Sequence, residues 1–284
     1  MVEEASAKRR RKEQAKPQLV ADMRHTLGTE MKVVGLDQMP AEPQPVDWSV
    51  PFVVRVSSDV MAEKVLEGQV KSLRLKFANS NERNHPGRGQ RACTEGAATR
   101  FADLIGKMIP EDRRIDRTRL KPDMLITKDL APGAYVIAKE KHTYNQEGGH
   151  LAMARLGFTG FREIWCVKTL PMLQYLNAQT EKSLSMKAMN DLLKVMTADE
   201  MKAFITSGAS FYHCTAGPQD CVMLPSCWTF GERITTRDDA AGLKQSFLLS
   251  TDLAELELMN ACLLEQGKPS DSLQHAIDFL TLQL

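Results

Sequence analysis

Histidine and cysteine residues gather in the stretch 211–231, which reads FYHCTAGPQDCVMLPSCWTFG. Such side chains could coordinate zinc, or a Cys–His pair could act as a nucleophile with its base. The cysteines at 214, 221 and 227 do not form the Cys-x-x-Cys knuckle that is usual in structural zinc sites. Because cysteine is among the most often buried residue types, we interpret these thiols as core residues.

The same stretch predicts the strands that would position these side chains. Cys221 to Leu224 alternate between the two faces of a half-buried strand, and the Gly-Pro turn at 216–220 separates this strand from the one before it. Pro225 lacks the N–H that a central strand needs, so the second strand should end there. Tight turns and short strands predict a mainly β domain.

Three segments resemble the cupin and Jumonji-C (JmjC) family, the double-stranded β-helix of many Fe(II)/2-oxoglutarate oxygenases. The family pattern Gly-Asp-apolar-x-apolar-Pro-x-x-Trp is similar to residues 219–228, QDCVMLPSCW. A Gly-aromatic-basic-x-apolar strand is matched at 160–167, GFREIWCV, and a later family strand at 242–248. The resemblance covers roughly residues 130–250 and implies a barrel of this type.

The resemblance also implies where a metal should bind, and the residues there do not match. A facial triad needs two histidines and a carboxylate. Two residues after His142 and His150, where the family has its acid, stand Tyr144 and Ala152; the distal histidine position falls on Thr229 or Phe230. We therefore expect no metal and no cofactor. The unconventional ligand set that remains open is the following: His142, His150, Glu147 and His213.

Other family positions suggest a pocket. Arg162 matches the basic residue that, in some family members, anchors the 2-oxoglutarate carboxylate, although an outward salt bridge is equally compatible with the sequence. The aromatic candidates for the pocket wall are Trp165, Trp228 and Phe230.

The totals describe an ordinary globular chain. It has 284 residues, 43% hydrophobic and 26% charged residues, and a net charge of +1, so no global field favours nucleic acid or acidic membrane. No apolar run reaches the roughly 18 residues of a membrane span, and no signal peptide is evident. Six cysteines without a dense pattern indicate an intracellular, reducing location.

The chain divides into four predicted parts, with a helical insertion in the barrel at about 183–206. They are a disordered basic and Pro-rich arm at 1–50, a helical flank at 51–125, a JmjC/cupin-like barrel at 126–250, and C-terminal helices at 251–284. The overall class is α+β, mainly β with flanking helices.

Two basic regions raise other interpretations. A nuclear localisation signal or a nucleic-acid arm would use the run Lys8, Arg9, Arg10, Arg11 and Lys12. Arg83, Arg88, Arg91 and the charged segment 112–119 could form a phosphate-facing patch, but a salt-bridged surface is the more common role of such charges.

We predict a catalytically degenerate barrel, a pseudoenzyme that acts as a binding or scaffold module with a nuclear location. One alternative is a Fe(II)/2-oxoglutarate dioxygenase of the hydroxylase or demethylase type with unconventional ligands. The other is a nucleic-acid-binding module that uses the arginine-rich segments. A protein or nucleic-acid partner is compatible with the sequence and a membrane is not; the oligomeric state and the substrate are undetermined.

Overall fold

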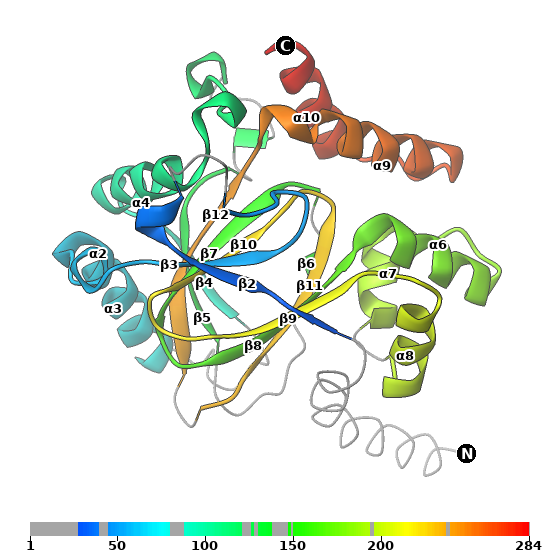
Figure 1. Ribbon diagram of the computed structural model, residues 1–284. Coiled ribbons are helices and arrows are strands. Elements are labelled where there is room, and N and C mark those ends of the chain that lie inside the picture. The colour runs from blue at the N-terminus through cyan, green and yellow to red at the C-terminus, as the bar shows by residue number, and fades with distance from the viewer. Residues whose placement is uncertain are drawn as a thin grey trace.

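The structure, a computed structural model, describes residues 28–39, 45–79, 88–120, 126–127, 130–137, 147–148, 150–193, 196–236 and 239–283. These residues form a mixed α/β domain in which two β-sheets lie face to face and helices pack outside them (Figure 1). Within these ranges no helix is long and apolar enough to cross a bilayer.

The larger sheet has seven strands in the part of the chain that is described. Their order is β2 (Lys32–Gly35), β3 (Phe52–Arg55), β10 (Asp220–Leu224), β7 (Ala152–Thr159), β12 (Ala240–Phe247), β5 (Gly133–Ile137) and β4 (Arg88–Ala92). β2 runs parallel to β3, and the other neighbours are antiparallel. The predicted strand in residues 221–224 is therefore confirmed as β10, which ends before Pro225. The prediction that it is half-buried is wrong, because β10 is a central strand and both of its faces are buried.

The smaller sheet has five strands over the same described ranges. Their order is β1 (Thr29–Glu30), β9 (Phe211–Ala216), β8 (Arg162–Lys168), β11 (Trp228–Ile234) and β6 (Glu147–Gly148). β1 is parallel to β9, whereas β8 is antiparallel to both β9 and β11. Consecutive strands β7 and β8 lie in different sheets, and so do β9 and β10.

Helices cover the outer faces of both sheets (Figure 1). α2 (Ser58–Met61), α3 (Lys64–Asn79) and α4 (Glu95–Met108) lie with the seven-stranded sheet; α6 (Thr169–Thr180), α7 (Met186–Leu193), α8 (Ala198–Thr206), α9 (Leu253–Glu265) and α10 (Asp271–Thr281) lie with the five-stranded sheet. Local sequence explains α4: Thr94 stands at its N-cap, Pro110 follows its end, and Phe101, Leu104 and Ile105 recur on one buried face.

Strands with both faces buried create three layers of apolar contacts. On β10, Cys221 and Met223 face the outer helices, whereas Val222 and Leu224 face the space between the sheets. The same period-2 alternation applies to β8, where Ile164 faces inward. The layer between the sheets therefore receives every second residue of β8 and β10, and of β7, β11 and β12 in the same way.

The predicted segment boundaries differ from the structure at the N-terminal side. β1 and β2 lie inside the stretch expected to be a disordered arm, because Met31 and Val34 are buried against the two sheets. The predicted helical flank contains β3 and β4, and the helices between β8 and β9 already begin at Thr169, earlier than the insertion predicted at 183–206. Non-local strand pairing decides the first two differences, because β1, β2, β3 and β4 pair with strands that are distant in the sequence or lie across a loop.

Candidate functional site

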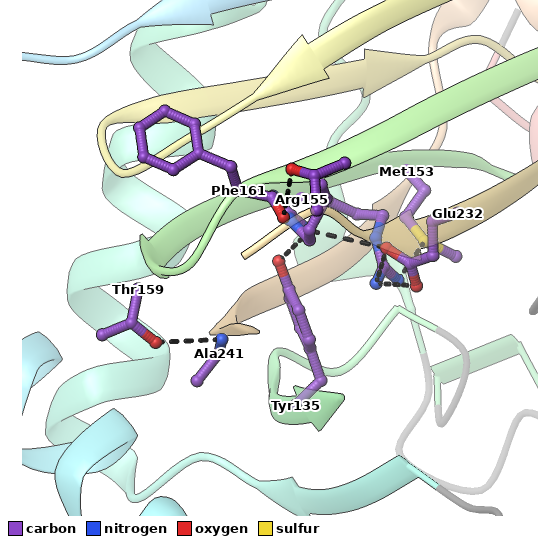
Figure 2. Close-up of polar contacts among 9 residues, drawn as sticks. Tyr135, Met153, Arg155, Thr159, Phe161, Glu232 and Ala241 are labelled. Atoms are coloured by element: carbon purple, nitrogen blue, oxygen red, sulfur yellow. Dashed lines mark hydrogen bonds and ion pairs between the residues drawn. The ribbon is translucent and has the colours of Figure 1, made fainter. Parts of the chain in front are cut away.

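A cluster of buried polar side chains lies between the two sheets (Figure 2). Arg155 on β7 and Tyr135 on β5 come from the seven-stranded sheet, and Glu232 on β11 and Arg162 on β8 come from the five-stranded sheet. The neighbours of Arg155 and Tyr135 along their strands pack beneath the outer helices. Arg162 and Glu232 lie two residues from Ile164 and Phe230, which face inward, so alternation turns all four side chains of the cluster inward. The cluster joins the two sheets.

A bidentate ion pair is the centre of the cluster. Nη2 of Arg155 donates to Oε1 and Oε2 of Glu232 at 2.7 and 3.0 Å, and both side chains are fully buried. The guanidinium carbon of Arg155 lies 4.3 Å from the ring centroid of Tyr135 and 5.0 Å from that of Phe230, so two cation–π contacts add to the ion pair. The rings of Tyr135 and Phe230 contact the guanidinium group of Arg155, which water would contact if the group lay at the protein surface.

Arg162 is the fourth member of the cluster, and one of its buried nitrogen atoms has no hydrogen-bond partner. Its Nη1 donates to the hydroxyl of Tyr135 and lies 3.6 Å from Oε2 of Glu232, beyond hydrogen-bond length. Its Nη2 is buried and has no hydrogen-bond partner. The guanidinium that the sequence suggested as a carboxylate anchor therefore faces the interior, where it holds a phenol and shares one carboxylate with Arg155.

The electrostatics of this interior oppose a divalent cation. Two buried guanidinium groups contact one carboxylate, so the described cluster has an excess positive charge. A buried charge is expensive unless it is paired, and a metal ion placed beside two guanidinium groups would be repelled.

The described candidate metal ligands do not converge on this interior. Nε2 of His150 lies 3.0 Å from Oγ of Ser272 at the start of α10. His213 lies on the same side of β9 as Phe211, whose ring stacks on Trp165 in the helix-covered outer layer. His142 is outside the described residues; Glu147 belongs to β6, but only its backbone is described. No group of three potential ligands is found within the described ranges.

The positions where the family resemblance placed ligands have other roles. Ala152 packs in the outer core beneath α3 and α4. The hydroxyl of Thr229 lies 2.9 Å from that of Thr169 on α6, so Thr229 faces away from the interior. Phe230 does face inward, and its ring packs beside Arg155. None of these three side chains offers a metal ligand to the space between the sheets.

The three aromatic pocket candidates separate into two layers. Trp165 is turned outward and stacks on Phe211 at 6.3 Å, whereas Trp228 and Phe230 are turned inward. Nε1 of Trp228 donates to the backbone oxygen of Ser49, and its ring meets Tyr212 edge-on at 5.5 Å. Adjacent residues of a strand point to opposite faces, and Trp165 directly follows the inward-facing Ile164. Trp165 therefore does not line the space between the sheets.

The cysteines of the stretch 211–231 are buried in three different layers. Cys214 faces the interior, Cys221 the layer beneath α3 and α4, and Cys227 the layer beneath α9. Burial raises the pKa of Cys221 and of Cys227 to about 12, so both thiols are protonated at neutral pH. These thiols fit the interpretation as core residues.

The arginines of the charged segment 112–119 bind backbone oxygens. Arg114 donates to Ile109, Arg117 to Leu130, and Arg119 to Leu282. These hydrogen bonds connect the segment to the end of α4, to Leu130 before β5 and to the end of α10. The three arginines therefore have a structural role. The basic run 8–12 and Arg83 are outside the described residues, and only the backbone of Arg88 and Arg91 is described, so the nuclear and nucleic-acid interpretations stay predictions.

Sequence reasoning missed Arg155, Glu232 and Tyr135. A signal for Arg155 was present, because it is a charged residue inside a strand whose neighbours on both faces are apolar, LAMARLGF at 151–158. Glu232 gives a weaker signal, because Arg233 follows it in CWTFGERI at 227–234. Neither a scan against protein-family models nor a search of curated proteins found a match for this chain.

Proposed function

We propose that this protein is a catalytically degenerate barrel of the cupin/JmjC type that acts by binding rather than by oxidation. The observation on which the proposal rests is the buried Arg155–Glu232 pair beneath Phe230. Phe230 stands at a position where the resemblance predicts a metal-binding histidine. Arg155 and Glu232, which lie beside its ring, form an ion pair with each other.

The order of the strands supports this type of barrel. From β5 to β12 the chain visits the seven- and five-stranded sheets in the order seven, five, seven, five, five, seven, five, seven. An antiparallel chain wound as a double-stranded helix alternates between two facing sheets in this way, and cupins belong to the architectures that close two sheets upon each other. The resemblance of residues 160–167, 219–228 and 242–248 falls on β8, β10 and β12.

Fe(II) and 2-oxoglutarate, which the resemblance would imply, do not fit the described interior. The metal would need anionic and imidazole ligands beside an open position, and the inward-facing Phe230 and Trp228 supply neither. Arg162, the residue that would hold the co-substrate, is engaged with Tyr135. We derive no oxidative step for this chain.

The first test is anaerobic titration calorimetry of Fe(II) into the purified full-length protein, with and without 2-oxoglutarate. We expect no binding of one equivalent at micromolar concentration, because the described interior is cationic and lacks three convergent ligands. Binding of one ion that 2-oxoglutarate tightens, or iron-dependent consumption of 2-oxoglutarate, would overturn the proposal. Substitutions of His142, His150 and His213 would then locate the ligands.

A further inference from the structure

β2 forms one edge of the seven-stranded sheet. It is the first strand in the order of this sheet, so within the described ranges only β3 pairs with Lys32–Gly35. In a parallel pair, every second residue directs its backbone N–H and C=O groups toward the partner strand, and the residues between direct theirs away. Half of the backbone groups of β2 therefore point out of the sheet.

Two hydrogen bonds show which residues of β2 these are. The N–H of Val56 donates to the turn before β10 at 2.9 Å, so alternation along β3 turns the backbone groups of Val53 toward β2. Val33 stands opposite Val53, and its own backbone groups therefore point away from β3. Gly35, two residues later, agrees with this assignment, because its N–H donates to Oε1 of Gln38 at 2.9 Å. The N–H and C=O groups of Val33 thus lie on the outer edge of the sheet.

A large cavity lies beside this edge. Its volume is about 1390 Å³, and Val33 and Val34 on β2 and Ile109 and Pro110 after α4 are among the residues that line it. Val33 is 52% exposed, whereas Val34 and Ile109 belong to the core layer beneath the outer helices. Sites for small molecules usually have volumes of about 300–1,000 Å³. The cavity therefore has room for a ligand larger than a typical small molecule.

The charges around the cavity favour an uncharged ligand. Arg55 already pairs with the buried Asp220 at 2.7 Å. A ligand with a strong charge of either sign would be repelled by part of the lining, whereas apolar groups can pack on the valine, isoleucine and proline side chains. The charged residues that line the cavity are Asp37, Glu111 and Asp112, which are acidic, and Arg55, Lys107 and Arg114, which are basic.

We propose that the edge of β2 and the adjoining cavity bind an extended, mainly apolar peptide segment of a partner protein. The backbone of the segment exchanges hydrogen bonds with the N–H and C=O groups of Val33, and every second side chain of the segment enters the cavity. An extended chain is the ligand that supplies a backbone donor and acceptor together with alternating side chains. The inference goes beyond the proposed function, because this surface lies outside the space between the sheets.

The test begins with a phage-displayed library of random heptapeptides that is selected on the full-length protein. We expect enriched sequences with apolar residues at alternate positions, because successive side chains of an added strand point to opposite faces. Fluorescence anisotropy of capped synthetic peptides then gives the Kd. Methylation of one peptide nitrogen at a time should weaken binding about tenfold at the residue that donates to Val33, and little at its two neighbours.

Protein variants locate the binding surface. Val33→Pro removes an N–H that points out of the sheet, so it should weaken peptide binding about tenfold and keep the pairing with β3. Val34→Pro removes an N–H that faces β3 and should lower the stability instead. Ser57→Trp, at an exposed residue of the lining, should weaken binding because the indole ring would occupy the cavity. Lys268→Trp, at an exposed residue after α9, is the matched control and should leave binding intact.

Three results would overturn the inference. In the first, no peptide is enriched above a selection without the protein. In the second, the enriched peptides bind Val33→Pro and Ser57→Trp as tightly as they bind the wild-type protein. In the third, sedimentation velocity shows a dimer that Val33→Pro dissociates, so that a second copy of the chain occupies the edge. None of these results changes the outcome of the Fe(II) titration, so the failures of the two proposals can be told apart.

Discussion

At the scale of single residues, two glycines give the side chains of the buried cluster the space that they need. Gly157 and Gly242 stand opposite each other on β7 and β12. A Cβ on Gly242 would lie 2.6 Å from the hydroxyl of Tyr135, and one on Gly157 would lie 3.1 Å from Nη2 of Arg162. Bare backbone at this pair therefore allows the phenol and the guanidinium to lie close against the sheet.

The Arg155–Glu232 pair predicts a large effect of a small change. Glu232→Gln should lower the free energy of unfolding by about 3–5 kcal/mol, because two buried guanidinium groups would lose their carboxylate. The measurement is urea unfolding at pH 7. Glu67→Gln is the matched control: it breaks an exposed pair with Lys71 on α3 and should cost only about 0.2–0.5 kcal/mol. Equal costs for the two variants would contradict the role of the buried pair.

At the scale of elements, a buried carboxyl group lies in the 3-10 turn Ser250–Asp252 that leads into α9. Asp252 accepts the backbone N–H of Leu249 at 2.8 Å and is 7% exposed. Burial raises its pKa from 3.8 to about 6; Glu255 adds to the rise, whereas the Leu249 N–H and Arg113 oppose it. The residue at the N-cap of α9 is therefore an acid that is partly protonated near pH 6.

The sign of the resulting pH dependence follows from the raised pKa. The folded chain keeps a proton on Asp252 that the unfolded chain releases between about pH 4 and 6, so the stability from this group is present below pH 4 and is lost as the pH rises. Relative to Asp252→Asn, the wild-type protein should lose about 2 kcal/mol between pH 4 and pH 7. Urea unfolding of both proteins at several pH values measures this difference, and parallel stability curves would show that the pKa is not raised.

At the scale of the whole molecule, a short N-terminal segment adds a strand to each sheet. β1 pairs with β9 in the five-stranded sheet, and β2 pairs with β3 in the seven-stranded sheet. Met31 between them is 2% exposed and Val34 on β2 is 4% exposed. Residues 29–35 thus tie the two sheets together from one end of the chain (Figure 1).

Truncation tests this contribution. A chain that starts at residue 36 should be less stable than a chain that starts at residue 28 by at least about 3 kcal/mol, because burial of each large apolar side chain is worth about 1.5–3 kcal/mol. Urea unfolding of both chains gives the difference. Val33→Ser is the control, since Val33 is 52% exposed and should contribute little. A midpoint that is the same for both truncated chains would mean that β1 and β2 do not stabilise the sheets.

The sequence by itself determined several local elements of the fold. Alternation in residues 221–224 and the signals at Thr94 and Pro110 are properties of neighbouring residues, and they predicted β10 and α4. The chain alone also shows that Ala152 and Phe230 stand at positions where the resemblance predicts metal ligands.

Only the tertiary structure decided which face of each strand lies inside. A period of two assigns side chains to two faces but does not say which face is the interior, so Arg162 and Trp165 could be separated only when the sheets were paired. Arg155 and Glu232 are 77 residues apart, and β2 meets β3 across the loop between them. Such contacts depend on register between distant strands, which no local pattern specifies.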